Sequence, residues 1–218
     1  MLRKMFVGAA VSLTITVLLA LGNAGALLAP QLWVLLAVGI LANVFQPTYN
    51  PFDKSGTAED RGTALQILWS VYLTQVVTVV EAIYLRYPDS FRWDLTTTIG
   101  LICMIAGLIL RTWAVFVLGR YFTWHISVQR GQRVIRNGPY RFVRHPSYAG
   151  AFLTYVFSPV FLHAWYSTCI APVVLALAFS RRIRHEETVL KANLGREYEV
   201  YCQKVGALVP RLGNVARK

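Results

Sequence analysis

The sequence has few cysteines, few acidic residues and no glycine-rich nucleotide-binding pattern. Its three cysteines have no paired spacing, so neither a disulfide framework nor a zinc site follows from them. The four histidines also lack metal-ligand spacing, and no metal is expected. Because no G-x-G-x-x-G or P-loop sequence occurs, binding of phosphate by such a loop is unsupported.

Charge is scarce and has mostly one sign. Only 15% of the residues are charged and 56% are hydrophobic, which is too apolar for a soluble protein. Lysine and arginine number 22 against 10 acidic residues, a net charge of +12. We attribute this excess to membrane topology and to attraction of anionic lipid headgroups. The basic residues do not form a separate soluble domain, so nucleic acid is not expected as a partner.

Long apolar runs are abundant. Compared with the roughly 20 residues that cross a bilayer, the candidates are residues 6–28, 32–45, 63–85, 95–118, 148–162 and 166–181. We therefore predict an all-α, polytopic integral membrane protein with about five to six transmembrane helices and a cytosolic C-terminal cofactor pocket. The first run is too long for a signal peptide. The last two are short, and Pro159 and the turn at 163–165 divide them, which indicates a tight hairpin that does not quite span.

The basic residues fix the predicted orientation. With six passes, Arg86 and Arg92 alone lie on the outer side, which places both termini in the cytosol. The short chain and the lack of an N-x-[ST] sequon favour a prokaryotic inner membrane. Two charges, Glu81 and Arg111, fall within spans. They are far enough apart that a direct pair is doubtful, and both are expected to snorkel.

The most irregular segment, residues 136–150, reads RNGPYRFVRHPSYAG. It predicts a turn followed by a new helix, with His145 near the cap and Pro146 at the first helical position. Such a helix start can receive an anion. The alternative is an ordinary basic and aromatic loop at the membrane interface. Tyr140 and Tyr148 would flank the anion site.

The region after the hairpin, residues 181–205, has helical periodicity and predicts an amphipathic cytosolic helix, bent or restarted at Gly195. Arg182 and Glu186 share one face, and the pair of Glu187 and Lys191 lies on the adjacent face. We expect one pair to be catalytic, although both are also compatible with surface ion pairs. The hairpin brings this helix close to residues 136–150.

Three glycines and one polar loop give simpler expectations. Gly100 and Gly107 suit close helix packing, and Gly150 allows a backbone or a ligand to approach. The polar segment at 47–62 is either a connection or a lid over the site.

RNGPYRFVRHPSYAG followed by EETVLKANLGREYEVYCQKV resembles the C-terminal half of isoprenylcysteine carboxyl methyltransferases and their prokaryotic relatives, within the wider group that includes phospholipid methyltransferases. The similarity covers roughly residues 118–210. It implies residues 1–118 as a transmembrane scaffold and residues 119–218 as a methyltransferase-like region. The family position that falls on Ser127 is often glutamine, and Gln132 stands where histidine is common.

The resemblance implies S-adenosylmethionine as cofactor and a carboxylate on a lipophilic or lipidated substrate as methyl acceptor. Carried over onto this sequence, the expected cofactor contacts are Gln132, Arg133, Val134, Ile135, Tyr140, His145, Pro146, Ser147, Tyr148 and Glu186. Arg182 would bind the substrate carboxylate, and Arg182 and Glu186 would be the catalytic residues.

Three rival functions stay open. A membrane sterol-type reductase would bind NADPH at a related motif. An N-methyltransferase acting on an aminolipid would require a group that accepts a proton from the amine, and Arg182 is unsuited to that role. A non-catalytic scaffold would use the basic loop only as a topogenic signal.

Overall fold

The computed structural model describes residues 13–44, except residue 15, and residues 60–211. The main helices are α2 (Pro30–Val44), α3 (Thr63–Val80), α4 (Leu95–Leu118), α5 (Pro146–Phe161) and α6 (Trp165–Lys204). Within these ranges there is no strand, which agrees with the helical fold class. The start of the first expected span and most of the 47–62 segment lie outside the described residues.

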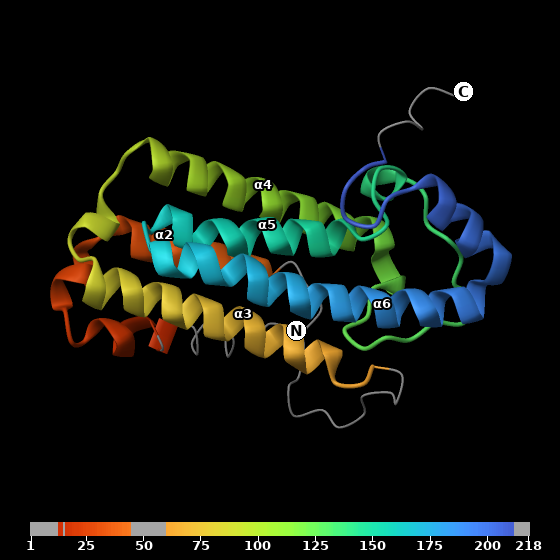
Figure 1. Ribbon diagram of the computed structural model, residues 1–218, viewed down its shortest axis with the longest axis horizontal. Helices are drawn as coiled ribbons and strands as arrows, with labels where there is room; N and C mark the ends of the chain where they lie inside the picture. Colours follow the sequence, from red (N-terminus) through yellow and green to blue (C-terminus); the bar gives the residue numbers. More distant parts are fainter. Residues whose placement is uncertain (1–12, 15, 45–59, 212–218) are drawn as a thin grey trace.

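The helices form an elongated bundle in which α3, α4, α5 and α6 run side by side (Figure 1). Two of the described helices are long and apolar enough to cross a membrane, at Thr63–Leu85 and Leu95–Tyr121, and Pro30–Ala42 is a shorter apolar helix. The expected number of five to six spans therefore stays a prediction.

Glycines explain how closely α4 and α5 approach. A Cβ added at Gly107 would lie 2.6 Å from the Gly150 carbonyl oxygen, and one at Gly150 would lie 2.5 Å from the Gly107 carbonyl oxygen. A Cβ at Gly100 would lie 2.7 Å from the Phe161 nitrogen. The expectation of close packing at these glycines is confirmed.

The hairpin of α5 and α6 turns at the predicted position, but its second helix is longer than predicted. The amphipathic segment does not begin a new helix near residue 181, because α6 continues from Trp165 through the polar region as far as the break at Gly195. At about 1.5 Å per residue, the part of α6 before Gly195 alone is longer than the hydrocarbon layer. Its polar end thus projects beyond the bundle, beside the loops that follow α4 (Figure 1). Gly195, with φ of 55°, kinks it at the predicted position.

Glu81 is only 3% exposed, so it does not snorkel as expected. Its carboxylate accepts hydrogen bonds from the backbone N–H groups of Tyr166 at 3.0 Å and Ser167 at 2.8 Å, and it pairs with Arg86. Arg111 is also buried, at 8% exposure. The doubt about a direct pair was justified, since Glu81 stabilises the first turn of α6.

Replacing Glu81 with alanine is expected to lower the free energy of unfolding by about 2–3 kcal/mol, because buried donors at the start of α6 lose a charged acceptor. Thermal unfolding of the detergent-purified protein measures this. Glu81→Gln, which keeps one acceptor oxygen, should lose less. Equal stability of the alanine variant and the wild type would contradict the capping role.

Candidate functional site

The first wall of the site is the start of α5. His145 is the N-cap residue and Pro146 the first helical residue, as the sequence predicted. Among the residues that the structure describes, no side chain caps this helix end. The Ser147 hydroxyl oxygen is buried and has no hydrogen-bond partner among the described residues. A helix start with these features offers unused donors to an anion.

The second wall is the polar half of α6. The Tyr148 hydroxyl donates to Glu186 at 2.7 Å and accepts from the Arg182 Nε at 3.1 Å. The imidazole of His145 stacks on the Tyr148 ring, with centroids 5.7 Å apart. Tyr148 therefore joins the start of α5 to two charged residues of α6.

A hollow of about 880 Å³, part of it open to solvent, lies between these walls. Tyr140 and Glu186 both face it, although one belongs to the loop before α5 and the other to α6. Of the residues expected at the site, the lining includes Gln132, Arg133, Val134, Ile135, Tyr140, His145, Ser147, Tyr148, Arg182 and Glu186. Pro146 is not among them, because it is fully buried at the first turn of α5.

Several lining residues were missed. They include the segment after α4, with Tyr121, Phe122 and Thr123, and an apolar face of α6, with Val189, Leu190, Leu194, Tyr198 and Tyr201. The helical periodicity of this face was visible in the sequence. It was interpreted only as amphipathicity, since nothing in the pattern says whether such a face meets lipid or a ligand cavity.

Glu187 has stronger partners besides the expected one. Arg144 donates to it at 2.7 Å and His145 lies 3.1 Å away, while the predicted ion pair with Lys191 is also present, at 3.9 Å. Burial would raise the pKa of Glu187, but the hydrogen bonds from His145 and Arg144 outweigh it and lower the pKa to about 2. This partly buried cluster connects α6 with the loop before α5.

The low pKa predicts how stability depends on pH. A carboxylate with a folded pKa below its unfolded value of 4.5 stabilises the protein above pH 4.5, and this contribution is lost as the pH falls towards 2. The wild type should thus exceed Glu187→Gln in stability by on the order of 1–2 kcal/mol at pH 6, after allowance for solvent screening. Unfolding of both proteins between pH 6 and pH 3 tests this prediction. If the difference in their free energies of unfolding does not shrink as the pH falls, the prediction is contradicted.

Tyr140 is a buried, uncharged group of the loop. Burial, followed by the charge of Glu186, raises the pKa of Tyr140, so its phenol stays protonated at neutral pH. Its hydroxyl donates to the Ala114 carbonyl at 3.3 Å, and its own carbonyl accepts from the Tyr201 hydroxyl at 2.6 Å. Tyr140 thereby connects α4 with the end of α6.

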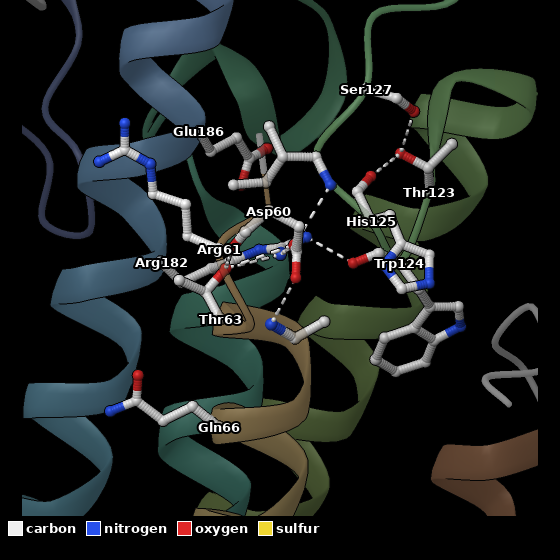
Figure 2. Close-up of polar contacts among 12 residues, drawn as sticks. Asp60, Arg61, Thr63, Gln66, Thr123, Trp124, His125, Ser127, Arg182 and Glu186 are labelled. Carbon is white, nitrogen blue, oxygen red and sulfur yellow. Dashed lines mark hydrogen bonds and ion pairs between the residues drawn. The ribbon is translucent and has the colours of Figure 1, made fainter. Parts of the chain in front are cut away.

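Arg182 does not pair with Glu186, which was its expected partner on the helix face. Among the described residues its ion pair is with Asp60, just before α3, and Figure 2 shows the two side chains pointing toward one another. Sequence reasoning missed Asp60, which stands in the segment interpreted as a connection or a lid. No metal-binding group of three or more histidine, cysteine or acidic residues occurs in the described ranges.

A second, apolar cavity lies within the bundle, in contact with all five main helices. It has a volume of about 1260 Å³, part of it open. Arg111 and Trp124 line the cavity where it approaches the hollow. Arg111 donates to the Ser147 carbonyl at 3.2 Å, and Trp124 accepts from Arg182. Arg111 and Trp124, which line the cavity, are thus hydrogen-bonded to Ser147 and Arg182, which line the hollow.

Comparison with known proteins gives consistent matches. Residues 99–192 match the model of the isoprenylcysteine carboxyl methyltransferase family. A probable protein-S-isoprenylcysteine O-methyltransferase of Oryza sativa subsp. indica is 37% identical over 128 residues, which cover 58% of this chain and 67% of the relative. Protein-S-isoprenylcysteine O-methyltransferase B of Arabidopsis thaliana is 34% identical over 142 residues, covering 63% and 72%.

The fold also has a solved counterpart. The structure of a eukaryotic intramembrane Ras methyltransferase, an isoprenylcysteine carboxyl methyltransferase, superposes with a TM-score of 0.64. The match covers 93% of this chain and 73% of the other, at 20% sequence identity. At that identity the likeness concerns the helical membrane fold alone.

Proposed function

The chain belongs to the isoprenylcysteine carboxyl methyltransferase family, and from that premise we propose that it transfers a methyl group from S-adenosylmethionine to a carboxylate of a lipophilic, isoprenylcysteine-like acceptor. The protein is thus a membrane methyltransferase. We assign the scaffold to residues 1–118 and the chemistry to residues 119–218. The observation that carries the proposal is the shared hollow in which the uncapped start of α5 faces Glu186.

The residues of the hollow fit the two ends of this cofactor. The start of α5, with the orphaned Ser147 hydroxyl, suits a carboxylate. Glu186 suits an ammonium group, because a carboxylate is the strongest acceptor for such a donor. Residues 132–135 and the apolar face of α6 suit an adenosine moiety. S-adenosylmethionine has all three groups.

The acceptor would meet the cofactor from the membrane side. Its hydrocarbon chain suits the apolar cavity. Arg182, which lines the hollow and donates to the carbonyl of Trp124 at the cavity, would orient its carboxylate. When bound, S-adenosylmethionine supplies an electrophilic methyl group. A carboxylate is ionised at neutral pH, so the protein needs no general base and contributes alignment and exclusion of water.

We further propose that the hollow opens to the cytosol, with both termini on that side, in a prokaryotic inner membrane. The support is the distribution of basic residues, of which Arg86 and Arg92 alone fall at the opposite end. A water-soluble cofactor would then enter from the cytosol and a lipid acceptor from between the helices.

The function is tested with purified protein. Calorimetry should detect binding of S-adenosylmethionine and not of NADPH, and labelled methyl groups should pass to a prenylcysteine analogue. The methyl ester of the same analogue is the matched control, since it lacks a carboxylate and should remain unlabelled. Binding of NADPH would favour a reductase. Labelling of phosphatidylethanolamine would favour an N-methyltransferase, and binding of neither cofactor would favour a scaffold.

A further inference from the structure

Arg182 uses most of its donors inside the protein. Nη1 donates to the Asp60 carboxylate and, at 2.9 Å, to the Thr63 hydroxyl (Figure 2). Nη2 donates to the Trp124 carbonyl at 2.5 Å, and Nε donates to the Tyr148 hydroxyl at 3.1 Å. An arginine has five N–H donors. The described residues engage four of them, which leaves one, on Nη2, for a ligand.

The Asp60 carboxylate is also fixed in position by hydrogen bonds within the protein. One carboxylate oxygen accepts from the backbone N–H of Ala64 at 3.2 Å, and the other accepts from the N–H of Ile126 at 3.4 Å. The side chains of Asp60 and Arg182 are only 5% and 4% exposed. Breaking such a buried pair is costly. Arg182 is therefore held in one position, and its positive charge is balanced by Asp60, just before α3.

We propose that Asp60 is a positioning residue for methyl transfer, which orients Arg182 and balances its charge so that the acceptor carboxylate is aligned but stays reactive. This inference rests on the proposed function. The negative charge of the acceptor disappears as the ester forms. A buried guanidinium without a counter-ion would bind the charged ground state more tightly than the transition state, and such binding does not accelerate the reaction.

The neighbouring Arg181 attaches α6 to the start of α3 without a carboxylate partner among the described residues. Arg181 donates to the side chain of Gln66 and to the carbonyl of Arg61 at 3.2 Å, near the start of α3. This exposed arginine is thus held by neutral acceptors. Arg182, which faces the hollow, has a carboxylate partner instead.

The test is Asp60→Asn, which keeps the shape and one acceptor oxygen but removes the charge. We expect kcat to fall by roughly 10-fold and the KM for a prenylcysteine analogue to fall by roughly 3-fold, because the ground state gains stabilisation that the transition state lacks. The affinity for S-adenosylmethionine should change less than about 2-fold. Gln66→Ala is the matched control, and it should change none of these quantities.

Each outcome decides the proposal. Parallel decreases in kcat and KM support it, while a higher KM, or kinetics like those of Gln66→Ala, would overturn it. Asp60→Ser provides a second neutral variant, and failure of both to fold would assign Asp60 a purely structural role and also overturn the proposal. A wild type that binds S-adenosylmethionine but methylates no carboxylate would refute the proposed function itself, before any variant is compared.

Discussion

Replacing Glu186 with alanine is expected to weaken the binding of S-adenosylmethionine by roughly 100-fold, the effect of losing one or two charge-assisted hydrogen bonds. Glu186 faces the hollow and has a hydrogen bond from Tyr148 at 2.7 Å. Without the Glu186 carboxylate, the ammonium group of the bound cofactor would lose its anionic partner in the hollow. Isothermal titration of the purified variant measures the effect.

The control for this change is Glu199→Ala. Glu199 is an exposed glutamate of the same helix, outside the hollow, and its loss should leave cofactor affinity unaltered. Unfolding temperatures show whether either variant is damaged. A Glu186→Ala protein that folds and binds S-adenosylmethionine with wild-type affinity would refute the assignment of this residue.

Replacing Arg182 with alanine should have the largest effect on turnover, a loss of kcat/KM on the order of 1000-fold. The variant removes the cation that aligns the acceptor carboxylate, and it also leaves Asp60 buried without its ion pair. The second consequence alone costs roughly 3–5 kcal/mol of stability. Methyl transfer to a prenylcysteine analogue measures the activity, and thermal unfolding measures the stability.

A double variant separates the two consequences. Asp60→Asn combined with Arg182→Ala removes both charges, so much of the lost stability should return while methyl transfer stays low. Recovery of activity in the double variant would show that Arg182 matters only for folding. It would contradict a role in binding the acceptor.

Local features of this protein were predictable because they depend on residues close in sequence. Pro146 at the start of α5 follows from proline stereochemistry, and the kink at Gly195 follows from the freedom of glycine. The approach of α4 and α5 followed from their glycines in the same way. The residues gathered around the hollow came from motifs that resemble a known family.

The contacts that Asp60 and Glu81 make with distant segments could not be predicted. Asp60 and Arg182 are 122 positions apart, and no local pattern relates them. The capping of α6 by Glu81 spans 85 positions or more and requires the bundle to exist. The continuity of α6 was missed for another reason. Arginines near residue 181 mark the end of an apolar run, yet polar residues favour a helix as well, so hydropathy cannot show where the helix ends.

The central claim is that the hollow between the start of α5 and the polar half of α6 binds the methyl donor. An experimental structure with S-adenosylhomocysteine bound tests it most directly. We predict that the ligand lies between residues 132–135 and α6, with its amino acid end at Ser147 and Glu186. A ligand found at any other place on the protein, with this hollow empty, would contradict the account.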